Sequence, residues 1–259
     1  MILLIDEYDA PLLSTYGFGC YNEAVNFFKL LYGSVLKSNI NLKMGVMTGA
    51  VRIAQAGIFS DLNNLKVNTI LSEKYDEYFG LIEKEVEQAL KDYEIEYKLD
   101  EVKEWYDGYK FGNMEVYNPW SILNYIDNGK LKAYWINTSG NLVIKDLLMK
   151  SDSGVFETLQ ELIEGKDKIV FINENIALGN NLAPNSLWEL MLFSGYLTVE
   201  EKIDYTTYTV RIPNQEVRSF FKTLFVDVLF TSKYRNIGEM KQALVSKNFN
   251  GKIVEGYTE

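Results

Sequence analysis

The sequence of 259 residues contains no histidine and a single cysteine, Cys20. Without histidine, the chain has no imidazole to bind zinc or iron and none to serve as the base for a serine or cysteine nucleophile. One cysteine excludes an intramolecular disulfide and a cysteine-based zinc site. A metal would therefore have to be a hard cation on oxygen ligands, and magnesium is the first candidate.

Long apolar runs and an excess of positive charge are missing as well. No apolar run approaches the roughly 18 residues that a membrane-spanning helix needs. The start lacks the basic region of a signal peptide, and Asp6 and Glu7 interrupt its apolar stretch. The formal net charge is -10, so the surface as a whole should repel nucleic acid. We expect a cytoplasmic protein that neither crosses a membrane nor binds nucleic acid directly.

What is present is an ordinary globular composition, with 47% hydrophobic and 24% charged residues. A continuous apolar run over 2–5 predicts a strand that is buried on both faces, as in a parallel sheet. Helical spacing of apolar residues follows over 24–36, and a second apolar strand over 42–47. This order predicts an α/β segment. A weaker strand is predicted over 67–71, and a helix over 82–93.

Beyond about residue 97 the pattern becomes mainly helical. The stretch GYLTVEEKIDYTTYTVRI alternates apolar and polar residues, which predicts a two-stranded hairpin. A helix followed by this hairpin suggests a winged-helix element. We therefore predict two domains, 1–96 and 97–259. Short helices are predicted in the second around 101–106, 120–126, 142–148, 156–163, 186–193, 216–230 and 237–245.

Two adjacent carboxylates, Asp6 and Glu7, follow the first strand directly. Four apolar residues and then Asp-Glu match the Walker B element of P-loop nucleotidases. A strand end places such residues at the carboxyl edge of the sheet, where ligands of open α/β folds bind. In this interpretation Asp6 holds magnesium, and Glu7 orients and deprotonates the water that attacks the γ-phosphate. The alternative is that the acids only terminate a strand.

Thr48 ends the second strand, and Arg52 follows four residues later. In P-loop nucleotidases with an added central strand, the strand after the Walker B ends in a polar residue that senses the γ-phosphate. We therefore predict Thr48 as this sensor. Arg52 would stabilise charge on the transferring phosphoryl group, although a surface position in a loop explains this arginine more simply.

Eight stretches of the sequence, in this order, carry a resemblance to a known family: LLIDEYDAPL, FFKLLYGSVLK, TGAVRIAQAGIFSDLNNLK, EWYDGYKFG, VYNPWSIL, YWINTSGN, LWELMLFSGYLTV and RIPNQEV. Together they resemble an AAA-ATPase-like family of bacterial and archaeal proteins, which often carries a carboxyl-terminal PD-(D/E)XK nuclease-like domain. The resemblance implies a core that binds ATP and Mg²⁺, followed by a helical and winged-helix lid. It implies Asp6 and Glu7 as the Walker B acids, Thr48 as the sensor threonine and Arg52 as the arginine after it.

The sequence departs from this family in two respects. The phosphate loop GxxxxGK[ST], expected ahead of the Walker B strand, does not occur, and neither Gly165-Lys166 nor Gly251-Lys252 continues with serine or threonine. The nuclease-like domain is missing too. We therefore expect 1–96 to be a partial P-loop core in a fragment with little or no ATPase activity of its own. Its sheet would expose apolar edges, so that it would rearrange, be marginally stable or pair with another copy.

A second hypothesis is a non-catalytic module that binds a protein partner through the lid and the winged helix. The missing phosphate loop and an acidic, aromatic-rich composition motivate it. Arg211 and Arg218, which flank IPNQEV, would either approach a nucleotide from the lid or form salt bridges within it. The aromatic residues of EWYDGYKFG would either stack on a base or pack the lid against the core.

Overall fold

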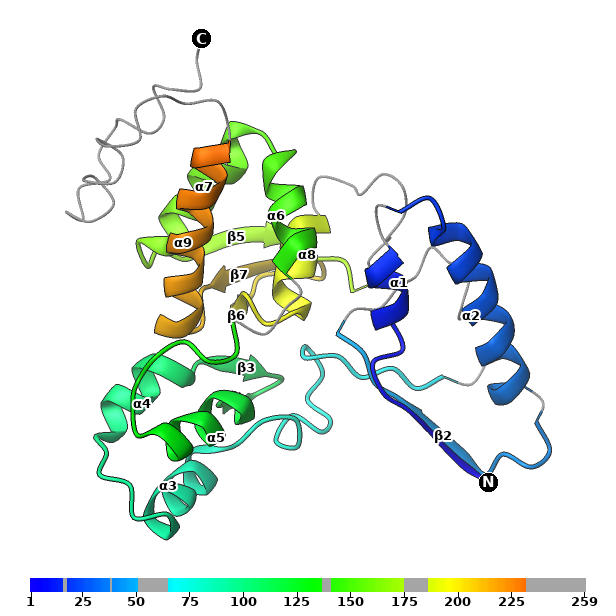
Figure 1. The fold of residues 1–259 in the computed structure, drawn as a ribbon, viewed down its shortest axis with the longest axis horizontal. Coiled ribbons are helices and arrows are strands. Elements are labelled where there is room, and N and C mark those ends of the chain that lie inside the picture. Colours follow the sequence, from blue (N-terminus) through cyan, green and yellow to red (C-terminus); the bar gives the residue numbers. More distant parts are fainter. Residues whose placement is uncertain (16–17, 38, 51–64, 137–140, 175–185, 232–259) are drawn as a thin grey trace. The chain divides into compact units, whose positions relative to one another are not determined.

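The computed structural model describes 1–15, 18–37, 39–50, 65–136, 141–174 and 186–231 (Figure 1). The chain divides into two compact units. Unit 1 comprises Met1–Thr69 and Phe171–Ser194, and unit 2 comprises Ile70–Val170 and the residues from Gly195 onward. The predicted mixed α/β class is confirmed. A domain boundary near residue 97 stays a prediction.

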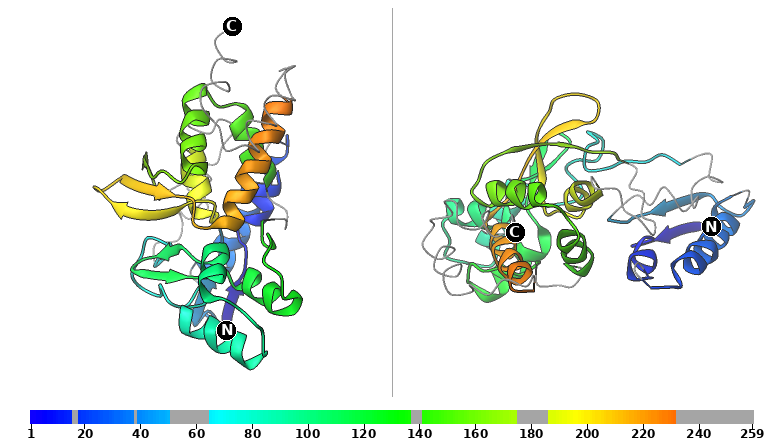
Figure 2. Two further views of the ribbon diagram at one scale, coloured as in Figure 1. Left: turned by 90° about the vertical axis from the view of Figure 1, so that its left-hand side faces the viewer. Right: turned by 90° about the horizontal axis from the view of Figure 1, so that it is seen from above.

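Unit 1 is built on two parallel strands, β1 (Ile2–Ile5) and β2 (Met44–Met47), as predicted. The predicted helix between them is α2 (Tyr21–Leu36), and a short helix that was not predicted, α1 (Ala10–Thr15), precedes it. Figure 2 shows α1 and α2 on the same side of the two strands. Unit 1 also contains α8 (Ser186–Phe193), a predicted helix.

The prediction that β1 is buried on both faces is wrong. Ile2 and Leu4 are 58% and 72% exposed, and their partners Met44 and Val46 are 50% and 43% exposed. Side chains alternate along a strand, so these four share one face, which is open to solvent among the described residues. The opposite face lies against α2, because a Cβ at Gly45 would approach the side chain of Leu36 to 2.8 Å.

Unit 2 is mainly helical, with two small sheets. The helices predicted between 82 and 230 are confirmed, the one over 186–193 as α8 of unit 1, whereas the helix predicted over 237–245 lies outside the described residues. The strand predicted over 67–71 is wrong: the backbone there forms no ladder, and the carbonyl of Ile70 instead accepts a hydrogen bond from the N–H of Gly112. The helices of unit 2 are α3 (Glu83–Asp92), α4 (Leu99–Tyr106), α5 (Pro119–Asn128), α6 (Asn141–Met149), α7 (Ser153–Ile163) and α9 (Gln215–Thr231).

The sheets of unit 2 are antiparallel hairpins, one of them extended by a third strand. The predicted hairpin is β6 (Thr198–Lys202) with β7 (Thr207–Arg211), and the sheet order is β5-β7-β6. Three strands were not predicted: β3 (Tyr109–Phe111), β4 (Met114–Val116) and β5 (Lys168–Phe171). Whether the hairpin and α8 form a winged helix stays a prediction. Among the described residues, no helix is both long and apolar enough to span a bilayer.

Side chains of α3, α4 and α5 form a tyrosine-rich core in unit 2. Asn118 starts α5, because its side-chain oxygen accepts a hydrogen bond from the N–H of Ser121 at 3.3 Å and Pro119 occupies the first helical turn. The buried members of the core are Val86, Leu90, Val102, Tyr106, Tyr117, Ile122, Tyr125, Ile126 and Tyr134.

The carboxylate of Glu216, at the start of α9, is fully buried. One of its oxygens accepts hydrogen bonds from the backbone N–H groups of Tyr134 and Trp135, at 2.5 and 2.6 Å. The other accepts a hydrogen bond from the hydroxyl of Ser121 on α5, at 2.6 Å. A buried charge is tolerated when such donors replace water. Glu216 thereby joins the start of α9 to two segments that lie 81 to 95 positions earlier in the sequence.

Replacement of Glu216 by alanine should destabilise the protein by about 3 kcal/mol or more, because two buried donors and one half-buried donor lose their acceptor. Urea denaturation followed by circular dichroism measures this change. The control is Glu157→Ala on α7, which removes an exposed glutamate and should change the stability by less than about 0.5 kcal/mol. Equal losses in the two variants would contradict the role given to Glu216.

Candidate functional site

The ends of β1 and β2 bring Asp6 and Thr48 together. The strands are parallel and in register up to Ile5 opposite Met47, so the residues that follow them are neighbours at the carboxyl edge. The hydroxyl of Thr48 donates a short hydrogen bond to the carboxylate of Asp6. The N–H of Glu7 lies 3.1 Å from the same carboxylate oxygen and 3.3 Å from the threonine hydroxyl. Three of the predicted site residues therefore meet at one point.

Glu7 adopts a left-handed backbone conformation, with a φ of 48°. For a residue with a Cβ this conformation costs about 1–2 kcal/mol. It turns the chain out of β1 at once, and the N–H of Tyr8 then donates to the carbonyl of Thr48 at 2.9 Å. The side chains of Asp6 and Glu7 are exposed, and Thr48 is half-buried. The two acids can therefore be reached from solvent.

Beneath these acids, Tyr8 and Asp9 are buried and fix the turn. The hydroxyl of Tyr32 on α2 donates to the carbonyl of Tyr8 at 3.0 Å, and burial, followed by the charge of Asp9, raises the pKa of Tyr32. Gly49 leaves room for this packing, because a Cβ there would lie 2.6 Å from both Asp9 and the ring of Tyr8. Sequence reasoning missed Asp9 and Gly49, although Asp9 is the third acid in the stretch IDEYD.

The side-chain oxygen atoms at this edge of the sheet are suitable ligands for a hard cation. Asp6 and Thr48 offer only oxygen atoms, and Mg²⁺ in nucleotidases takes one or two protein oxygens and completes its shell with phosphate and water. Among the described residues, no group of three or more acids, cysteines or histidines could hold a metal by itself. Arg52, the fourth predicted site residue, lies outside the described residues.

Comparisons with known proteins bear on this region. Residues 1–59 match the model of a family described as "Predicted AAA-ATPase". The match supports an AAA-ATPase-like family for this segment. The chain is also 26% identical, over 97% of its length, to an "Uncharacterized protein in vnfD 5'region" from Azotobacter chroococcum mcd 1. It spans about half of that relative, 48% of the relative's length. No solved structure matches the chain.

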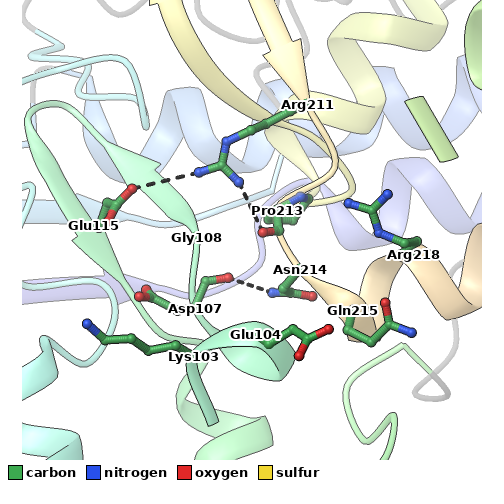
Figure 3. A pocket seen from close by; sticks show the side chains of 10 residues that line it. All are labelled: Lys103, Glu104, Asp107, Gly108, Glu115, Arg211, Pro213, Asn214, Gln215 and Arg218. Atoms are coloured by element: carbon green, nitrogen blue, oxygen red, sulfur yellow. Dashed lines mark hydrogen bonds and ion pairs between the residues drawn. The ribbon is translucent and has the colours of Figure 1, made fainter. Parts of the chain in front are cut away.

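Unit 2 contains a polar pocket of about 480 Å³ that includes Arg211 and Arg218 (Figure 3). Arg211 forms an ion pair with Glu200, with 2.7 Å between the side-chain atoms, and a longer one with Glu115 at 3.7 Å. Arg218 donates to the carbonyl of Ile163 at 2.8 Å, at the end of α7. Of the two predicted alternatives for these arginines, the structure shows an internal salt bridge for Arg211.

Asp107 is the unusual residue of this pocket. One of its carboxylate oxygens is buried and has no hydrogen-bond partner among the described residues. Burial, and more weakly the negative charge of Glu115, raises the pKa of Asp107, while the N–H of Gly108 acts in the opposite direction. Its neighbours Tyr106 and Tyr109 are buried inside unit 2, so their rings are not available to stack on a base.

We expect Glu7→Gly to be more stable than Glu7→Ala by about 1 kcal/mol, because glycine adopts the left-handed conformation without a steric penalty. Thermal and urea unfolding of the two variants measure the difference. The same pair at Glu157, inside α7, is the control, and there alanine should be the more stable by about 1 kcal/mol. Alanine more stable than glycine at both positions would contradict the backbone geometry of the turn.

A raised pKa of Asp107 has a defined consequence for stability. The folded state holds the proton of Asp107 more tightly than the unfolded state. The protonated carboxyl therefore stabilises the folded protein fully at a pH below the pKa of the unfolded state. This stabilisation is lost as the pH rises through the pKa of the folded state. Asp107→Asn should therefore gain stability over the native protein as pH rises from about 4 to 7. Urea unfolding at several pH values measures this, with Glu157→Gln as the control. A constant difference would contradict the assignment.

Proposed function

We propose that Asp6, Glu7 and Thr48 form the magnesium- and water-binding edge of an ATP-hydrolysing site, which is complete in a longer protein. The hydrogen bond between Thr48 and Asp6 at the carboxyl edge of two parallel strands is the observation that supports this most directly. The similarity of residues 1–59 to a predicted AAA-ATPase family supports it independently.

Each residue has a distinct role in this proposal. Asp6 is the carboxylate for magnesium, and Thr48 orients it and senses the γ-phosphate. A bound Mg²⁺ would neutralise charge on the phosphate oxygens. The carboxylate of Glu7 has no hydrogen-bond partner among the described residues, so it is available to accept a proton from the attacking water. The rigid turn at Glu7 keeps this group beside Asp6 without moving the strand.

The 259 residues supply no glycine-rich loop to hold the triphosphate. Backbone N–H groups and a lysine of such a loop normally bind the β- and γ-phosphates. We therefore propose that this chain by itself hydrolyses ATP little or not at all, and that the longer protein uses nucleotide binding to control the lid or an attached partner. ATP hydrolysis by the 259-residue chain alone that disappears in Glu7→Gln would contradict the proposal that this chain is inactive.

In a protein that carries this region behind a glycine-rich phosphate loop, Glu7→Gln should lower kcat by about 10²–10⁴, the usual contribution of a general base. Binding of Mg-ATP should persist, because glutamine keeps the shape of the side chain. Steady-state hydrolysis and calorimetry measure the two effects. The control is Glu23→Gln, an exposed glutamate on α2 in the same unit, which should leave kcat unchanged. Equal kcat values for both variants would remove Glu7 from the mechanism.

The second candidate function is a non-catalytic module that binds a protein. The open apolar face of β1 and β2 favours it, because Leu4 there is 72% exposed. Titration of Mg-ATP into the 259-residue chain separates the two candidates. Binding with a micromolar Kd that weakens in Asp6→Asn favours a retained nucleotide site. No heat of binding, together with an unperturbed fold, favours the protein-binding module.

A further inference from the structure

Three large aromatic side chains are exposed within five consecutive residues of unit 2, in a loop that the proposed nucleotide site does not use. Tyr75, Tyr78 and Phe79 are 46%, 72% and 66% exposed. We call residues 72–80 the aromatic loop. A single exposed ring on a protein surface needs no explanation, whereas a cluster of rings is typical of binding surfaces.

The backbone of the aromatic loop is fixed at both ends and in the middle. The carbonyl of Ile70 accepts a hydrogen bond from the N–H of Gly112 at 2.8 Å, and Asp76 accepts one from the N–H of Asn113 at 3.2 Å. After the loop, Leu81 and Tyr117 exchange two backbone hydrogen bonds at 3.1 and 2.8 Å. These bonds hold the loop against the turn and end of the β3–β4 hairpin.

Close packing of glycines confirms how tightly the loop is held. Gly112 has a φ of 54°, and a Cβ there would lie 2.7 Å from the carbonyl oxygen of Ser72. A Cβ at Gly80 would lie 2.6 Å from the side chain of Val116. The exposed rings therefore project from an ordered backbone, and a partner would not have to order the loop when it binds.

Tyr75 carries backbone strain that its own burial does not offset. Its φ is 70°, which costs about 1–2 kcal/mol for a residue with a Cβ, and nearly half of the side chain is exposed. The conformation places its ring at the edge of Tyr78, with 6.4 Å between the centroids. The ammonium group of Lys74 lies 4.6 Å from the centre of the Tyr75 ring. The loop thus already binds a cation to an aromatic face.

The charge of the loop indicates the kind of partner. Glu73, Asp76 and Glu77 outnumber Lys74 within it, and the whole chain has a net charge of -10. A second copy of this chain would bring the same acidic charge and would be repelled. A basic segment would pair with the acids and place its cations over the rings.

We propose that the aromatic loop is a docking site for a basic segment of a partner protein. Lysine or arginine side chains of that segment lie over Tyr78 and Phe79 and beside Glu73 and Glu77. The apolar parts of the same segment contact the exposed ring edges. This surface is independent of the proposed ATPase site, and either can fail without the other.

The test uses two capped hexapeptides, one of alternating arginine and leucine and one with glutamate in place of arginine. Binding to the 259-residue chain is followed by NMR on the aromatic ring signals. The arginine peptide should bind saturably and at least about tenfold more tightly than the glutamate peptide, and its Kd should rise with salt. The double variant Tyr78→Ser with Phe79→Ser should weaken it at least about tenfold, a loss of about 1.4 kcal/mol.

The matched control is Tyr205→Ser in the turn between β6 and β7. Tyr205 is 90% exposed and has Lys202 5.8 Å from its ring centre, but residues 203–206 contain no second aromatic residue. This variant should bind the arginine peptide like the native chain. Any of three results would overturn the proposal: no binding of the arginine peptide, equal binding by the double variant, or self-association of the chain through the same ring signals. Glu73→Gln with Glu77→Gln should weaken binding without changing the fold.

Discussion

Burial of one carboxylate organises unit 2. An ionised carboxylate away from water costs several kcal/mol unless donors surround it, so Glu216 can be buried only where α5 and the 134–135 backbone converge on the start of α9. Asn214, two residues before Glu216, connects the start of α9 to the turn at Asp107. Asn214 caps α9 by accepting a hydrogen bond from Val217 and donates to the backbone carbonyl of Asp107 at 2.9 Å. The turn that lines the pocket is therefore held by the same helix end.

In unit 1, the constraint on which the candidate site depends is the backbone pairing of β1 with β2. The parallel register of β1 and β2 decides that Asp6 and Thr48 are neighbours, and a slip of one strand by one residue would turn that strand's side chains to the opposite face. A pair of acids that only ended a strand would need neither the hydrogen bond from Thr48 nor the left-handed turn at Glu7. These two features favour the catalytic interpretation over the simpler one.

Local signals predicted most of the helices, because the helical spacing of apolar residues is a property of neighbouring residues. Asp6 and Thr48 were also predictable, since parallel strands align their ends. The partners of Glu216 were not, because they lie 81, 82 and 95 positions away. The strands β3 and β4 have three residues each, too few for a periodic pattern. The exposure of Leu4 depends on which element covers β1, and no local pattern contains that information.

Backbone strain occurs at both of the proposed functional surfaces. Three non-glycine residues there have a positive φ: Glu7, Tyr75 and Glu94. Glu94 follows the last turn of α3, where Ile95 donates to Leu90 and Glu94 to Lys91, the usual pattern that ends a helix. No helix end explains Glu7 or Tyr75. Each leaves an exposed side chain beside other exposed groups of the same chemistry, acids in one case and rings in the other. Strained backbone of this kind clusters at active sites and ligand-binding segments, and this tendency motivates the roles proposed for Glu7 and for the aromatic loop.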